Sequence, residues 1–298
     1  MNALLDVPAP AKLNRFLHVT GQRADGYHEL QSVFQLIDWC DTLHFESRRD
    51  GRLSREDLDG ADGDAPALPA DDLCLRAARA LQSASGCPLG VHIVLDKRIP
   101  QQAGLGGGSS DAASTLIALN RLWGLHWPRS ALMAIGERLG ADVPFFLGGR
   151  NAWVEGIGER LTPLDLPPAH FLVVKPAAGV PTAAIFQAPD LERATPPAIM
   201  ADFVAHLHGC PWQPWGRNDL QPVAVRLCPD IAQALGRLAA RGLAARMTGS
   251  GSAVFAVLPE GYTAKDELLR GWPNGWQVRV CRGLPEHPLI GWQKDAIM

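Results

Sequence analysis

Hydrophobic residues alternate with polar residues along several short segments of the chain, a pattern that predicts β-strands. The first such segment is residues 11–19, where Leu13, Leu17 and Val19 share one face and Lys12 and Asn14 lie on the other. An Asp-Gly pair follows at residues 25–26 and predicts a hairpin turn. Further strands are predicted at residues 32–38, 41–47, 90–99, 170–176 and 274–283, and a strand, a glycine-rich turn and a second strand at residues 244–258.

A 3.6-residue hydrophobic spacing in other segments predicts helices between these strands. Ser109, Ser110 and Asp111 are residue types that favour the N-cap position, and apolar residues follow them at helical spacing. The acid-rich residues 50–72 show no periodicity and are predicted to form a surface loop. Helices are also predicted at residues 72–82, 129–139, 181–186 and 229–241.

This interleaving of strands and helices, with several hairpins, predicts an α+β chain folded in two lobes. We place an N-terminal lobe at residues 1–160 and a C-terminal lobe at residues 161–298. A chain of 298 residues is long enough for two domains of ordinary size.

Composition then narrows the possible functions. A hydrophobic content of 47% with 20% charged residues is typical of a globular protein. The net charge of −3 argues against a nucleic-acid partner, and the longest apolar runs are too short to cross a membrane. The six cysteines form no C-x-x-C pair, and no signal-peptide pattern is found at the N-terminus, so we expect a cytoplasmic protein. We also expect it to be a monomer or a weak homodimer.

The segment "RIPQQAGLGGGSSDAASTLIALNRL", residues 98–122, places four glycines between a predicted strand and a predicted helix. A Walker A loop is excluded because no lysine follows the glycines, and a dinucleotide-binding fingerprint is weak because Ser109 stands in place of its third glycine. Two interpretations remain open: a phosphate-binding loop made of backbone N–H groups, or a flexible turn that only begins a helix. A second Gly/Ser turn, "TGSGSAVF", begins at Thr248.

Four segments taken together resemble the GHMP family of small-molecule kinases; they are "PAPAKLNRFLHVTGQRADGYHELQSVFQLID", "IPQQAGLGGGSSDAA", "LGADVPFFLGG" and "MTGSGSAVF". The resemblance implies a first lobe like ribosomal protein S5 domain 2 and a ferredoxin-like second lobe. It also implies ATP as the phosphoryl donor, together with Mg²⁺. The one residue suggested as a ligand of Mg²⁺ is Ser110, by analogy with hydroxyl ligands in other proteins.

The family pattern also implies roles for individual residues. Asp142 is the expected general base for the acceptor hydroxyl; its alternative role is a helix N-cap ahead of Pro144. Lys12 is expected to pair with Asp142, and the alternative is a solvated strand lysine. The residues expected to bind ATP are Lys97, Pro100, Gln101, Gln102, Ala103, Gly104, Leu105, Gly106, Gly107, Gly108, Ser109, Ser110, Gly249, Ser250 and Gly251.

For the acceptor, the resemblance implies a small molecule that carries a cytidine diphosphate group. Asn14 would help to place it, Tyr27 and Phe186 would sandwich the base, and His28 would bond to the edge of the base. Three residues depart from the family pattern: Arg15, Asp72 and Gln187.

The sequence thus favours an ATP-dependent kinase that phosphorylates a hydroxyl group of this acceptor. Two alternatives stay open. One is a GHMP kinase acting on homoserine, mevalonate or a sugar, and the other is a non-catalytic nucleotide-binding module.

Overall fold

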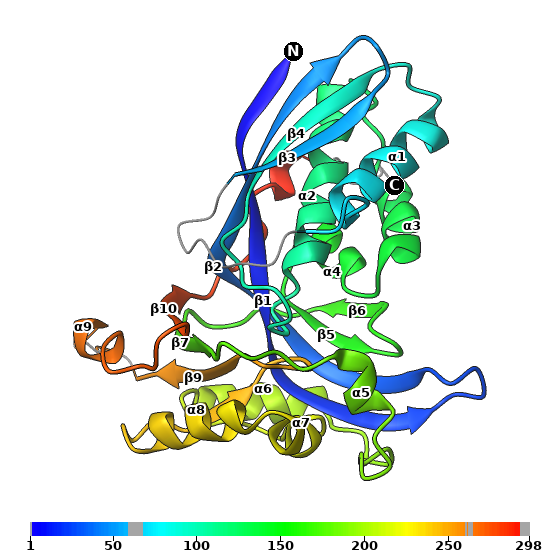
Figure 1. The fold of residues 1–298 in the computed structure, drawn as a ribbon. Coiled ribbons are helices and arrows are strands. Elements are labelled where there is room, and N and C mark those ends of the chain that lie inside the picture. The colour runs from blue at the N-terminus through cyan, green and yellow to red at the C-terminus, as the bar shows by residue number, and fades with distance from the viewer. Residues whose placement is uncertain (1, 59–67, 260, 262–264, 293–298) are drawn as a thin grey trace.

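A computed structural model describes residues 2–58, 68–259, 261 and 265–292. The first lobe is built on a six-stranded sheet in which β2 (His28–Arg48) pairs with three other strands. Figure 1 shows β1 and β2 as a long antiparallel hairpin that extends from the first lobe into the second. The remaining strands are β1 (Ala3–Gln22), β3 (Leu53–Leu58), β4 (Gly90–Asp96), β5 (Ala152–Glu155) and β6 (Arg160–Pro163).

Residues 73–148 contain four helices, and Figure 1 shows helices covering one face of this sheet. The second of them, α2 (Gly107–Leu122), is buried along most of its length, because it packs against the sheet on one side and against neighbouring helices on others. Small residues such as Ala112 and Ala113 allow α2 to pack closely against these neighbours. The other three are α1 (Leu73–Ser85), α3 (Arg129–Leu139) and α4 (Val143–Gly148).

The second lobe contains a four-stranded antiparallel sheet in the order β10-β7-β9-β8. Its strands and the two helices α8 and α9 follow one another as β-α-β-β-α-β, the connectivity of ferredoxin-like folds. The predicted α+β, two-lobed architecture is therefore confirmed. The elements of this lobe are β7 (His170–Lys175), α5 (Thr182–Phe186), α6 (Met200–Gly209), α7 (Gln221–Leu227), α8 (Pro229–Ala239), β8 (Ala245–Met247), β9 (Val254–Leu258), α9 (Lys265–Leu268) and β10 (Gln277–Arg282), followed by the short helix η1 (Ile290–Trp292).

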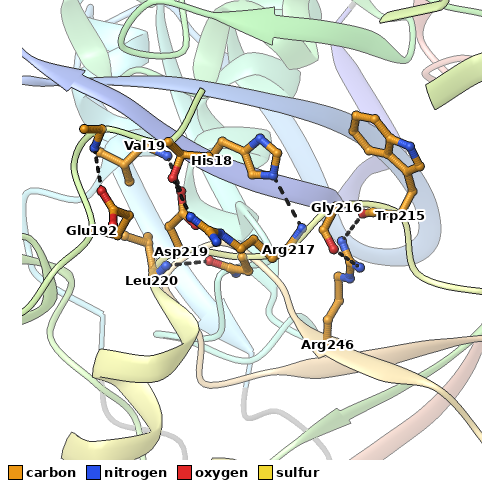
Figure 2. A network of polar contacts seen from close by, with 12 residues as sticks. His18, Val19, Glu192, Trp215, Gly216, Arg217, Asp219, Leu220 and Arg246 are labelled. Carbon is orange, nitrogen blue, oxygen red and sulfur yellow. Dashed lines mark hydrogen bonds and ion pairs between the residues drawn. The ribbon is translucent and has the colours of Figure 1, made fainter. Parts of the chain in front are cut away.

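The two lobes are joined by a polar network around the end of β1 (Figure 2). The carboxylate of Asp219 accepts hydrogen bonds from the Val19 backbone N–H (2.8 Å) and from the Thr195 hydroxyl (2.6 Å), and it pairs with Arg217. Arg246 donates to the carbonyl oxygens of two neighbouring loop residues, Trp215 and Gly216. These bonds fix β1, and thus the residues it carries, relative to the second lobe.

Arg15, which departs from the family pattern, lies at the same junction. Its guanidinium donates to Gln35 (2.7 Å) on β2 and lies over the Phe171 ring of β7 at 5.5 Å. Burial lowers the pKa of Arg15 to about 10. An arginine at this position therefore bridges the two sheets, whereas an apolar residue would contribute packing alone.

Several sequence predictions are wrong in detail. Residues 32–38 and 41–47 were predicted as two strands but belong to one strand, β2. An irregularity opposite Pro10 and Ala11 lets the pairing of β2 with β1 continue between them. Helix α2 begins at Gly107 behind an N-cap Gly106 and has no side-chain cap, so Ser109, Ser110 and Asp111 lie inside the helix.

The acid-rich segment also differs from the prediction. Residues 53–58 form β3, which pairs in parallel with β4 at the edge of the sheet, where Glu56 and Asp57 are exposed and Arg55 is largely buried. Residues 59–67 lie outside the described part of the chain. Asp72, the second departure, caps α1 by accepting from the Leu75 N–H and pairs with Arg55 at 2.6 Å.

The predicted boundary between residues 160 and 161 stays a prediction. Strand β6 of the first sheet extends to Pro163, and Leu289 near the C-terminus packs into the core of the first lobe. None of the helices that the structure describes combines the length and the apolar composition needed to cross a membrane.

Candidate active site

A cavity of about 900 Å³ lies where the two lobes meet. The first lobe contributes β1, β2, the glycine loop and the residues before α4, and the second lobe contributes α5 and the Gly/Ser turn. The predicted site residues that line it are Lys12, Asn14, Tyr27, His28, Gly104, Gly106, Ser109, Asp142, Phe186, Gly249 and Ser250.

Lys12 and Asp142 form an ion pair in this cavity, with 3.3 Å between Lys12 Nζ and Asp142 Oδ2. The Lys12 side chain is only 4% exposed, and its ammonium lies 4.3 Å from the centre of the Phe34 ring. The alternative of a solvated strand lysine is therefore wrong. Asp142 stands at the N-cap position of α4, but its side chain makes no capping hydrogen bond. Its carboxylate, 29% exposed, is available to a ligand.

Asn14 connects this pair to the second lobe. Its Oδ1 accepts a hydrogen bond from Lys12 Nζ (2.7 Å), and its Nδ2 donates to the Ser32 hydroxyl (3.0 Å). The backbone N–H of Asn14 donates to the Thr248 hydroxyl (2.9 Å), at the start of the Gly/Ser turn. The position of the Lys12 ammonium thus depends on contacts with both lobes.

The glycine loop leads directly into the N-terminus of α2. Gly106 has φ +73° and is the N-cap, and the next N–H groups have no acceptor within the helix. A Cβ at Gly106 would lie 3.1 Å from Lys12 Cγ and 3.0 Å from the Phe146 ring. The open interpretation of a phosphate-binding loop is therefore favoured, because free N–H groups at a helix N-terminus lie next to a buried lysine.

The two glycine-containing loops contact each other. Gly104 has φ +71°, and a Cβ there would lie 2.2 Å from the Thr248 carbonyl oxygen. The backbone N–H groups of Ser252 and Ala253 donate to the carbonyls of Gln102 and Ala103. Glycine at residue 104 is thus required by the close approach of the second loop.

Lys97 lies behind the glycine loop rather than along the cavity wall. Its ammonium pairs with Asp41 and, at 2.8 Å, with Asp111 of α2. Asp41 also accepts from the backbone N–H groups of Arg98 and Ile99. Burial alone would lower the pKa of Lys97, but the two carboxylates outweigh it and raise that pKa. Burial raises the pKa of Asp111 well above its usual value, against the effect of Lys97.

The other residues expected to bind ATP are not among those that line the cavity. The side chains of Ala103, Leu105 and Ser110 are buried, and the Ser110 Oγ has no hydrogen-bond partner in the described part of the chain. These residues can reach a ligand only through their backbone. The other residues that were expected to bind ATP but do not line the cavity are Lys97, Pro100, Gln101, Gln102, Gly107, Gly108 and Gly251.

At the opposite end of the cavity, aromatic rings from the two lobes lie close together. The His28 ring, at the start of β2, lies 4.9 Å from the Phe186 ring at the end of α5, with 34° between their planes. Tyr27 is 60% exposed at the tip of the β1–β2 hairpin. Gln187, the third departure from the family pattern, also lines this end and ends α5.

Two residues that line the cavity, Arg193 and Ser32, were not predicted from the sequence. Arg193 lines the cavity and donates to His28 Nε2 at 3.1 Å, and Ser32 holds Asn14. Arg193 lies in a segment without regular structure, so no periodicity marks it. Ser32 lies opposite Leu17 in the β1–β2 pairing, and no sequence pattern marks its contact with Asn14.

Comparisons with known proteins agree with this geometry. Residues 72–150 match the family of GHMP kinases N terminal domain, and residues 208–275 match GHMP kinases C terminal. The chain is 61% identical to 4-diphosphocytidyl-2-C-methyl-D-erythritol kinase of Albidiferax ferrireducens over 98% of this chain and 96% of that protein. It is 60% identical to the kinase of the same name from Polaromonas sp., over 98% of this chain and 95% of that one.

Solved structures give the same result. A crystal structure of 4-(cytidine 5'-diphospho)-2C-methyl-D-erythritol kinase superposes with a TM-score of 0.76 and 37% identity, covering 93% of this chain and 98% of that one. Homoserine kinase from Cytophaga hutchinsonii shares the fold, with a TM-score of 0.66, 15% identity and 96% coverage of both chains. The matches to both terminal domains and the identity of about 60% along nearly the whole chain agree with one another, and the protein belongs to the GHMP kinase family.

Proposed function

We infer that this protein transfers the γ-phosphoryl group of ATP to the 2-hydroxyl of 4-diphosphocytidyl-2-C-methyl-D-erythritol. The products are the corresponding 2-phosphate and ADP, on the non-mevalonate route to isopentenyl diphosphate. The names of the close relatives support this acceptor. The observation that carries the proposal is the position of the Lys12–Asp142 pair, in one cavity with the glycine loop and the His28–Phe186 ring pair.

The glycine loop, residues 100–110, is the proposed phosphate site. The N–H groups at the start of α2 and the dipole of that helix favour an anion, and glycines keep the backbone accessible. Gly249, Ser250 and Gly251 would close over the phosphates from the second lobe. Lys97 pairs with two buried carboxylates behind the loop and supports it. Lys97 would therefore contribute to ATP binding indirectly, by holding the loop in place.

Asp142 is the proposed general base. Its carboxylate is partly exposed and does not cap α4, so it can orient the acceptor hydroxyl and accept its proton as transfer proceeds. The neighbouring Lys12 ammonium would attract the transferred phosphoryl group and keep Asp142 in place. Asn14 positions Lys12 through the 2.7 Å hydrogen bond. Proximity and charge neutralisation are the main requirements of this reaction.

The cytosine base is proposed to lie at the aromatic end of the cavity. Phe186 would stack on one face of the base and Tyr27 on the other, with His28 at its edge. Stacking a base on an aromatic side chain contributes about 1–3 kcal/mol. The exposure of Tyr27 is consistent with this role, because its ring gains a partner only when the base is bound.

Mg²⁺ is the metal that the family implies, and it would neutralise charge on the ATP phosphates. Among the residues described, no three His, Cys, Asp or Glu side chains are grouped to hold a metal ion. This fits Mg²⁺, which takes one or two protein ligands and completes its shell with phosphates and water. Asp142 is a carboxylate beside the proposed phosphate site, whereas the Ser110 hydroxyl, to which the analogy pointed, is buried and does not line the cavity.

The test is ADP release with Mg-ATP and a panel of acceptors. The proposal expects turnover with the cytidine diphosphate acceptor and a kcat/KM at least 100-fold lower with homoserine, mevalonate or a simple sugar, on the order of the discrimination that lost polar contacts give. Preference for one of the other acceptors would favour another GHMP activity. Absence of turnover with every acceptor would favour a non-catalytic nucleotide-binding module.

A further inference from the structure

Asn218 lies between strand β1 and the Gly/Ser turn that faces the cavity. It belongs to the segment between α6 and α7, residues 210–220, part of which lies beside β1 (Figure 2). Leu17 donates its N–H to the Arg217 carbonyl and accepts from the Asp219 N–H at its own carbonyl, both at 2.9 Å. Asn218 is thereby bridged to Leu17, and it is only 5% exposed. These backbone bonds fix its position relative to β1.

The side chain of Asn218 spans the start of the turn. Its Nδ2 donates to the carbonyl oxygens of Met247 and Gly249, each at 2.9 Å. Its Oδ1 accepts from the Leu220 N–H at 3.0 Å, so both N–H groups and the oxygen of the amide are engaged. Because Met247 and Gly249 flank Thr248, these bonds fix the backbone on both sides of Thr248.

Thr248 in turn contacts Asn14, the residue that holds Lys12. Its hydroxyl accepts from the Asn14 backbone N–H at 2.9 Å and lies 3.4 Å from the Gly104 carbonyl oxygen of the glycine loop. The Oδ1 of Asn14 accepts from Lys12 Nζ at 2.7 Å. Along this path, two residues, Thr248 and Asn14, connect the turn held by Asn218 to the Lys12 ammonium.

We propose that Asn218 is a positioning residue for phosphoryl transfer. It holds the Gly/Ser turn in the shape that closes over the phosphates and, through Thr248 and Asn14, it orients Lys12. The inference rests on the proposed function and deepens it. Asn218 does not line the cavity, so it acts through the turn and does not contact a substrate. Since Gly249 is also buried, loss of the amide leaves a buried carbonyl without this donor.

The chemistry of the amide explains why asparagine stands at this position. Its side chain supplies two N–H donors and one acceptor, and all three are used here. Aspartate has nearly the same size but would place a carboxylate against two carbonyl oxygens. Asn218→Asp therefore disrupts the turn with almost no change in volume. Asn218→Ala removes the same three bonds without adding a charge.

The first test measures the link to β1 without reference to activity. The Asn14 backbone N–H is held by Thr248, so its hydrogen exchange, followed by NMR of the full-length protein, reports how firmly the turn is held. We expect Asn218→Asp to speed this exchange about tenfold beyond any change at the amides of β7, the effect of about one lost hydrogen bond. Exchange at the wild-type rate in the folded variant would overturn the proposal.

The second test separates positioning from a merely structural role. In Asn218→Asp we expect the KM for ATP to rise about tenfold and kcat to fall about tenfold, while the Kd of cytidine 5'-diphosphate, measured by calorimetry, changes less than about twofold. The matched control is Asn120→Asp, because Asn120 is also buried and bonds to backbone groups, those of Trp127. The control should lower stability and keep the KM for ATP. Wild-type KM and kcat in Asn218→Asp would refute the role of Asn218.

These outcomes are distinct from failure of the proposed function, which would appear as absence of ADP with the cytidine diphosphate acceptor in the wild-type protein. In that case the exchange of the Asn14 amide still tests the hold of Asn218 on the turn. If Asn218→Asp does not fold, Asn218→Ala is the second variant. If neither folds, exchange of the Asn218 side-chain amide in the wild-type protein decides. Slow exchange of both its protons is expected, and rapid exchange would contradict the proposal.

Discussion

Lys12 Nζ lies 3.3 Å from Asp142 Oδ2, although one residue comes from β1 and the other from the residue just before α4. The two residues meet because α2 packs against both α4 and β1. The contact joins a buried cation to a partly exposed carboxylate at the edge of the glycine loop. This combination suits the proposed phosphoryl transfer, since one charge would orient the acceptor and the other would attract the transferred group.

Replacing Asp142 by Asn is expected to lower kcat about 10²–10⁴-fold, the range for loss of a general base. Folding should be preserved, because the carboxylate makes no capping hydrogen bond that the amide would lose. Steady-state kinetics with a parallel titration of ATP binding checks this. A kcat near the wild-type value would show that the carboxylate has no part in the reaction.

Tyr27→Ala is expected to raise the KM for the acceptor about 5- to 150-fold, equivalent to about 1–3 kcal/mol of lost base stacking. The KM for ATP should change less than twofold, and the thermal midpoint should be unchanged because the ring is 60% exposed. Initial rates with each substrate varied in turn distinguish these effects. Equal increases in both KM values would contradict a cytosine-stacking role.

Gly104→Ala is expected to destabilise the protein and weaken ATP binding together. Its positive φ costs an L-residue about 1–2 kcal/mol, and the clash with the Thr248 carbonyl adds about 1–3 kcal/mol. Gly124→Ala is the matched control, because Gly124 has φ +68° and open space around the added Cβ. Urea unfolding should show the larger loss for Gly104→Ala, and similar losses in both variants would refute the requirement for close approach.

His287 is expected to make the stability fall in acid. The ring is buried near Gly149, and burial lowers its pKa to about 3, below the usual value of about 6.5. The unfolded chain therefore binds more protons than the folded one between these values. Stability from this group is complete above pH 6.5 and decreases as pH falls, by about 1.4 kcal/mol between pH 7.5 and 5.5.

Urea unfolding of wild type, His287→Phe and His208→Gln at these two pH values measures that contribution. His208 is exposed on α6, so its replacement controls for loss of a histidine. His287→Phe should reduce the pH dependence by about 1 kcal/mol or more, while His208→Gln should leave it unchanged. An undiminished dependence in His287→Phe would show that other groups cause the loss of stability.

Much of the fold could be predicted from local patterns. Helix α3 spans the predicted residues 129–139, and the strands of the second lobe lie where alternation placed them. Strand β3 could not be predicted, because its stability comes from parallel pairing with β4 rather than from its own acid-rich sequence. Continuity of β2 likewise depends on its pairing with β1 across an irregularity, which no local pattern contains.

The site was predictable only in part. Composition left a phosphate-binding loop and a flexible turn as alternatives, whereas the pairing of Lys12 with Asp142 followed from the family resemblance, since nothing in the sequence between them signals the contact. The contacts of Arg193 with backbone carbonyls, and those of Lys97 with Asp41 and Asp111, depend on tertiary packing. In both cases the partners come from separate segments of the chain. Such convergence becomes visible only in three dimensions.

The central claim is that phosphates bind at the glycine loop, the cytidine group binds at the aromatic end, and Lys12 and Asp142 lie between them. The most direct measurement is a crystal structure with a nonhydrolysable ATP analogue and the cytidine diphosphate acceptor together. The account predicts the γ-phosphate beside Lys12 and the acceptor hydroxyl within hydrogen-bond reach of Asp142. A triphosphate bound away from the start of α2, or a cytosine remote from Phe186, would contradict it.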